Sequence, residues 1–187
     1  MRKIFKIILA IIAVLIIMVV AFGAIIFLDV AAYTATGSQT LTPTGVTVGK
    51  AIVIYDPGLS GTSKVVADKV ASDLQTKGYT VTLAGVKSSA TGITNGYSII
   101  VVGGPVYAGA LTGSTKEALS NMVLDQGAKI GVYGSGQGAT SPEDIAQIKQ
   151  SMLARSDLTL QNVIVVKIGS NEDLNARAQD FVNQLVA

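Results

Sequence analysis

Three short segments rich in Gly, Ser and Thr carry the groups of this chain that are best suited to binding a ligand. The first, Asp56-Pro-Gly-Leu-Ser-Gly-Thr-Ser63, follows the apolar run Ala51–Tyr55 and leads into a stretch with helical spacing. Such a loop offers backbone N–H groups, hydroxyls and the positive end of a helix dipole, which together suit a phosphate. The alternative is that a hydroxyl here only caps the helix. The candidate phosphate-binding residues are Ser60, Gly61, Thr62 and Ser63.

The other two segments follow later apolar runs of the chain. Gly103-Gly-Pro-Val-Tyr-Ala-Gly109 places a tyrosine between glycines, so that a ligand ring can approach the backbone and stack on a flat side chain. Gly134-Ser-Gly-Gln-Gly138 offers N–H groups to a carbonyl or a ring edge. Either segment alone is also explained as a glycine-rich turn, but three of them at one sheet edge predict a binding site. Its further candidate residues are Pro105, Val106, Tyr107, Ala108, Gly109, Gly134, Ser135, Gly136 and Gln137.

The chain contains no cysteine and no histidine. Disulfides, thiol catalysis and thiolate metal sites are therefore excluded, and so is a Ser-His-Asp triad. The commonest general base is also missing. A zinc site would need carboxylates alone, and we name no catalytic residue and no metal ligand.

Short apolar runs that alternate with helical patterns must position these segments. The pattern predicts an α/β domain with a parallel sheet covered by helices on both sides. A linking segment at 84–97 has little helical periodicity, and Ser170 and Asp173 have capping-box spacing for a last helix. The predicted strands are 51–55, 79–83, 98–102, 129–133 and 162–166, and the predicted helices are 63–76, 115–124, 142–154 and one after 173.

The N-terminal segment predicts a membrane anchor. Residues 7–28 form an uncharged run about 33 Å long as a helix, which is enough to cross a hydrocarbon core of about 30 Å. A cleaved signal peptide is the alternative, but its apolar part is usually shorter. Arg2, Lys3 and Lys6 precede the run, whereas the first basic residue after it is Lys50. This asymmetry places the N-terminus in the cytoplasm and the domain on the outer face of the cell membrane.

Beyond the anchor the chain has no net charge. From residue 30 onward eleven Lys and Arg balance eleven Asp and Glu. No basic patch is visible, so nucleic acid is not expected as a partner. We divide the chain into an anchor at 1–29, a flexible linker of small residues at 30–49 and one domain at 50–187.

The three segments resemble those of the flavodoxin family. Ser60-Gly-Thr-Ser63 is similar to its Thr-Gly-Asn-Thr phosphate loop, and Gly104-Pro-Val-Tyr-Ala-Gly109 to its Gly-(Ser/Thr)-Pro-x-Tyr-x-Gly loop. Tyr133-Gly-Ser-Gly136 resembles the Phe-Gly-x-Gly-Asp loop after the fourth strand. One departure is Asp56, which is expected to place a carboxylate near the phosphate.

This resemblance implies a flavodoxin-like three-layer sandwich with a five-stranded parallel sheet in the order 2-1-3-4-5. It also implies FMN at the three loops and electron transfer with a redox protein or a quinone. The alternatives are a flavin-free binding or scaffold module at the membrane and a flavin-dependent, quinone-type oxidoreductase.

Overall fold

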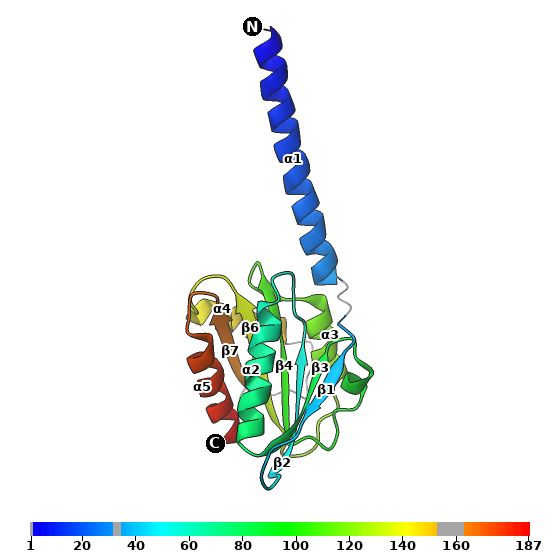
Figure 1. The fold of residues 1–187 in the computed structure, drawn as a ribbon, viewed down its shortest axis with the longest axis vertical. Helices are drawn as coiled ribbons and strands as arrows, with labels where there is room; N and C mark the ends of the chain where they lie inside the picture. The colour runs from blue at the N-terminus through cyan, green and yellow to red at the C-terminus, as the bar shows by residue number, and fades with distance from the viewer. Residues whose placement is uncertain (1, 32–34, 153–162) are drawn as a thin grey trace.

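Parallel strands form the centre of the fold, as the apolar runs predict. The computed structural model describes residues 2–31, 35–152 and 163–187. Its sheet has the order β1-β3-β2-β4-β6-β7, with the short strand β5 paired to β4 (Figure 1). The strands are β1 (Ser38–Leu41), β2 (Gly49–Tyr55), β3 (Tyr79–Gly85), β4 (Ile99–Tyr107), β5 (Ala110–Leu111), β6 (Lys129–Gly136) and β7 (Val163–Gly169).

The five predicted strands correspond to β2, β3, β4, β6 and β7, and all their pairings are parallel. Their order is the expected 2-1-3-4-5. The complete sheet is larger than predicted, because β1 adds an antiparallel edge strand beside β3 and β5 forms a hairpin with β4. Of the predicted strand 162–166, residue 162 lies outside the described residues.

Helices cover both faces of the sheet and bury two apolar cores. Helices α2 and α5 pack on one face, with Phe181 and Leu185 fully buried there. Helices α3 and α4 cover the other face, where Ile148 is fully buried. Strand β3 extends to Gly85, and the rest of segment 84–97 contains the 3₁₀ turn η1 (Ser89–Gly92) in place of an α-helix, as its weak periodicity predicts. The helices of the domain are α2 (Thr62–Thr76), α3 (Gly113–Asn121), α4 (Pro142–Ser151) and α5 (Leu174–Val186).

Strands β4 and β6 extend further than predicted, into two of the glycine-rich segments. Glycine disfavours strands when judged by propensity alone, but packing overrides that tendency here. A Cβ on Gly103 would lie 2.0 Å from the Tyr133 ring, and one on Gly134 would lie 2.5 Å from Val106. These positions are glycine because large side chains pack directly over the sheet. The residues predicted as loops are therefore held in a rigid ladder.

Part of the predicted linker belongs to the sheet. Residues Ser38–Leu41 form β1 and pair with Val81–Ala84 of β3. Further along the segment, the Val48 N–H donates to the Gly78 carbonyl at 2.9 Å. Three consecutive exposed polar residues, Ser38, Gln39 and Thr40, suit an edge strand, which the small-residue composition of the segment concealed.

Helix α1 (Arg2–Ala31) stands apart from the two cores (Figure 1). Its segment Ile4–Leu28 is long and apolar enough to cross a membrane, and none of its most apolar window is buried in the structure. It is therefore not a core helix of the described domain. A membrane anchor and a signal sequence both fit these properties.

Candidate functional site

The three predicted segments meet in one cavity at the carboxyl ends of the parallel strands. Its volume is about 210 Å³. The segments come from the β2–α2 loop, from the end of β4 and from the end of β6, and the β7–α5 loop adds a fourth side. The lining residues are Ser60, Thr62, Pro105, Val106, Tyr107, Ser135, Gly136, Gln137 and Ser170.

The β2–α2 loop presents hydroxyls at an uncapped helix start. Gly61 is the N-cap of α2 with φ 70°, and as a glycine it has no side chain that could cap the helix. The Ser60 hydroxyl donates to Thr62 Oγ1 at 3.0 Å and accepts from the Thr62 N–H at 3.3 Å. Nothing lies within 4 Å of a Cβ built on Gly61, so open space borders the loop here. The arrangement suits an anion because two hydroxyls lie beside the positive end of the helix dipole.

Ser63 does not belong to this cavity, although its sequence position predicted a phosphate contact. Its side chain is fully buried and lies 3.3 Å from the Tyr133 hydroxyl, which donates to the Ser63 carbonyl at 2.9 Å. Burial raises the pKa of Tyr133 well above its usual value, so this phenol keeps its proton. The first turn of α2 rotates Ser63 toward the sheet, and the sequence pattern did not reveal that rotation.

Tyr107 is fixed by a tight hairpin between β4 and β5. Tyr107 pairs with Ala110 across the two-residue turn formed by Ala108 and Gly109, whose φ values are 48° and 81°. Two positive φ values are typical of a type I′ turn. The Tyr107 hydroxyl accepts the Leu59 N–H at 3.1 Å. The side chain therefore bridges the first and second predicted segments, while Ala108 and Gly109 form the turn and do not line the cavity.

The third predicted segment contributes one strand end and its first loop residue. Gly134 is held in the sheet between Gly104 and Lys167, whereas Ser135, Gly136 and Gln137 reach the cavity. Ser170 also lines it, and its N–H donates to the Gly136 carbonyl at 2.9 Å. Sequence reasoning assigned Ser170 to a capping box. The structure shows Asp173 as the N-cap of α5, so that assignment was wrong.

Comparisons with known proteins identify the fold. No protein-family model matches the chain, and no curated protein matches it either. Among solved structures, oxidised flavodoxin 1 from Bacillus cereus aligns with TM-score 0.52 and 16% identity, over 73% of this chain and 96% of that one. Oxidised flavodoxin 2 from the same organism aligns with TM-score 0.50 and 19% identity, over 73% and 97%. A putative flavoprotein from Bacteroides eggerthii gives 0.50 and 8%, over 74% and 98%.

The fold is flavodoxin-like. The identities are too low to carry more than the architecture, so what the cavity does must be argued from its own residues.

Beneath the cavity of this flavodoxin-like domain lies Asp56, whose side chain is fully buried. Its Oδ1 accepts the Gly58 N–H at 3.0 Å, and its Oδ2 accepts the hydroxyls of Thr112, at 2.7 Å, and Ser114. Thr112 is the N-cap of α3. The carboxylate therefore ties the β2–α2 loop to the start of α3. It was expected to lie near a bound phosphate, but it is enclosed by its own donors and is absent from the cavity lining.

A second polar cluster supports the loops after β6 and β7. The buried Lys167 ammonium donates to Asp144 at 2.8 Å, and this bond, with that from the Ser141 N–H, holds the pKa of Asp144 below its usual 3.8. Burial raises the pKa of Glu172, but hydrogen bonds from Gly169 and Thr140 outweigh it and leave that pKa below 4.5. The cluster fixes the segment that follows Gln137.

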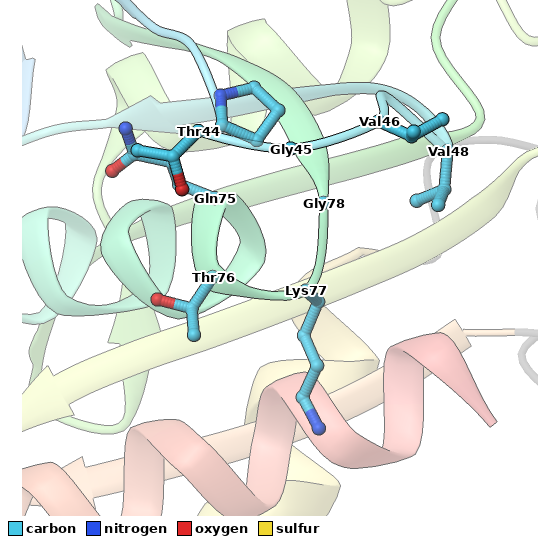
Figure 2. Close-up of a pocket in the computed structure, with 9 residues that line it drawn as sticks. Thr44, Gly45, Val46, Val48, Gln75, Thr76, Lys77 and Gly78 are labelled. Atoms are coloured by element: carbon cyan, nitrogen blue, oxygen red, sulfur yellow. The ribbon is translucent and has the colours of Figure 1, made fainter.

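A larger hollow of about 510 Å³ lies at the opposite end of the sheet, between the β1–β2 connection and the end of α2 (Figure 2). Figure 2 shows Lys77 pointing away from Gly45 and Val46. The hollow includes none of the predicted binding residues. Since ligands of open parallel sheets bind at the carboxyl ends of the strands, the smaller cavity is the candidate site.

Replacing Asp56 by alanine tests the support beneath the site. We expect D56A to lower the free energy of unfolding by about 2 kcal/mol or more, because the N–H and hydroxyl groups bonded to it lose their buried acceptor. Urea unfolding of the full chain in mild detergent measures this. The matched control is D180A, which removes an exposed carboxylate from α5 and should change stability by less than about 0.5 kcal/mol. Equal small effects would contradict the assigned role.

The pKa of Asp144 predicts a pH dependence. Because the folded-state pKa lies below the unfolded one, the Asp144–Lys167 pair stabilises the fold above about pH 4, and this contribution is lost as the pH falls through the folded-state pKa. We expect D144N to be less stable than the wild type at pH 7 and the difference to disappear near pH 2. Unfolding curves between these values check it, with D180N as the control. A difference independent of pH would be inconsistent with this ion pair.

Proposed function

We propose that this flavodoxin-like domain binds FMN in the cavity at the carboxyl edge of the sheet and transfers electrons, while α1 anchors it in a membrane. The observation that carries the proposal is the meeting of the three segments in one cavity. Hydroxyls at an uncapped helix start, a tyrosine fixed by a hairpin and polar groups at the end of β6 come from elements far apart in the sequence.

The β2–α2 loop would hold the phosphate of the nucleotide. Ser60 and Thr62 supply hydroxyls, and the first turn of α2 supplies N–H groups and the positive dipole end. The one carboxylate of this loop, Asp56, is enclosed by its own donors, so it does not repel an anion at the loop surface. The donor set therefore fits a phosphate monoester.

Tyr107 and the Ser135–Gln137 segment would border the flavin ring. The hairpin and the paired end of β6 hold these groups rigidly, so the chain's own part is to orient the ring and restrict water around it. FMN supplies reversible one- and two-electron chemistry when bound. The volume of about 210 Å³ is below the roughly 300–1,000 Å³ of typical small-molecule sites, so a bound nucleotide would extend beyond the cavity toward solvent.

One observation favours a flavin-free binding module as the second candidate. The Leu59 N–H, a backbone donor of the proposed phosphate loop, is already bonded to the Tyr107 hydroxyl. In that alternative, Tyr107 closes the loop permanently and the cavity serves another ligand. A flavin enzyme acting on quinones is a variant of the first proposal, with the same cofactor site and a measurable reductase activity.

Thr62→Glu separates the two candidates. Purified full-length chain in detergent should carry a yellow flavin or bind added FMN, measured by absorbance and by fluorescence titration. Glutamate suits the first turn of a helix, so T62E should remain folded, yet its charge should weaken FMN binding about tenfold or more. The control S72E adds the same charge on the exposed middle of α2 and should bind normally. A wild-type chain that binds no FMN would contradict the proposal of a flavin site.

Basic residues before the apolar run lead us to propose that the N-terminus is cytoplasmic and the domain lies outside. The chain has no native cysteine, so a single V46C variant offers one thiol at a position 88% exposed. We expect a membrane-impermeant maleimide to label V46C in intact cells. Labelling that requires cell lysis would reverse the assigned orientation.

A further inference from the structure

The point where the domain attaches to its anchor is fixed at the carboxyl edge of the sheet. The Ala35 carbonyl accepts the Lys87 N–H at 2.7 Å, and the Gly37 carbonyl accepts the Gly85 N–H at 2.9 Å. Gly85 ends β3 beside Tyr55, the last residue of β2. The proposed cofactor loop begins directly after Tyr55. Two strand spacings, about 10 Å, therefore separate the attachment point from the strand that leads into the site.

The chain between the anchor and this point is short. From Ala31, the end of α1, to Ala35 are four Cα steps, which span at most about 14 Å. From Leu28, the end of the apolar segment, to Ala31 a helix rises about 4.5 Å. Ala35 thus lies within about 19 Å of the end of the apolar segment. A domain of this size has a radius of gyration near 15 Å and a diameter near 38 Å, so the tether is too short for the domain to stand inverted, with its opposite edge toward the membrane.

The arrangement of α1 agrees with this estimate. Helix α1 contacts α3, which begins at the carboxyl edge of the sheet. Figure 1 shows α1 leaving the domain at the end where the parallel strands finish.

Three loops of the carboxyl edge carry little charge. Loops 56–61, 108–112 and 137–141 contain one charged residue, the buried Asp56. Exposed carboxylates flank them at Glu143, in the first turn of α4, and at Asp173, the N-cap of α5. Several other charged side chains next to these loops lie in opposite-charge pairs, which limits their net field. These pairs are Lys64 with Asp68, Lys87 with Glu117, Lys167 with Asp144 and Arg177 with Glu172. The loop side chain Leu59 is 47% exposed.

The opposite edge has a different character. Lys50, Lys77 and Lys129 are exposed there, at the starts of β2 and β6 and at the end of α2. The three loops with their exposed leucine can approach a lipid surface with little dehydration of charge, whereas the three exposed ammonium groups of the opposite edge meet that cost on a neutral lipid layer.

We propose that the carboxyl edge of the sheet faces the phospholipid surface and that the mouth of the candidate cavity opens toward it. The inference rests on the proposed anchoring by α1 and is independent of whether FMN binds. If FMN does bind, its exchange partner is a redox group held in the bilayer, because the short tether keeps the cavity beside the membrane.

Single cysteines in the full chain test the orientation. Ala139 is exposed beside the cavity and Val46 is exposed at the opposite edge, so A139C and V46C form a matched pair in a chain without native cysteine. Each carries the same thiol-linked fluorophore in phosphatidylcholine vesicles that contain a nitroxide on the lipid headgroup. We expect quenching at Ala139 to exceed that at Val46 at least threefold. Equal quenching, or stronger quenching at Val46, overturns the proposal.

Two further measurements separate the possible failures. Flotation of the labelled vesicles on a density gradient shows whether α1 anchors the chain. Failure to float refutes the proposed anchoring, whereas flotation with equal quenching refutes only the orientation. A twenty-residue Gly/Ser insertion before Ala35, about 25 Å in mean extent, should reduce the quenching difference at least twofold. An unchanged difference would overturn the short tether as its cause.

Discussion

The carboxylate of Asp56 organises the carboxyl edge of the sheet. A buried charge is expensive unless donors surround it, and here an N–H and two hydroxyls do so. The network extends through Thr112 to Thr115, whose hydroxyls lie 2.7 Å apart, and a Cβ on Gly104 would meet Thr115 Oγ1 at 2.1 Å. One interaction thus sets the path of the β2–α2 loop, the start of α3 and the identity of a glycine in β4.

Sequence patterns predicted the framework well because its signals are local. Apolar runs such as Ala51–Tyr55 are typical of strands buried on both faces of a parallel sheet, and alternating β-branched residues predicted the strand at 79–83. All five predicted strands are parallel strands of the sheet. Strand ends were harder to place. Gly103 and Gly134 were predicted in loops because glycine weakens a strand, but the Tyr133 ring and Val106 occupy the space that side chains there would need.

The sequence predicted the location of the site more accurately than the individual side chains that line it. Three segments were expected to meet at one edge, and residues from each line the cavity. Whether a given hydroxyl faces the cavity depends on the rotation of α2 against the sheet, which turns Ser63 to Tyr133 and leaves Thr62 at the opening. The role of Asp56 was equally hidden, since two of its donors lie 56 and 58 residues away in sequence. Long-range contacts of this kind produce no periodic pattern in the amino-acid sequence.

The edge strand β1 has a mechanical consequence for a domain held by one end. Tension from α1 enters the domain at Ala35, whose carbonyl is bonded to the Lys87 N–H, and passes along the axis of β1, whose residues 38–41 pair antiparallel with β3. The interstrand hydrogen bonds lie across that direction, so they are loaded together in shear and are not opened one after another as in a zipper. The four residues of β1, which cover a sheet edge, therefore also resist the pull of the anchor. They transmit the pull of the anchor into the centre of the sheet and spare the loops around the cavity.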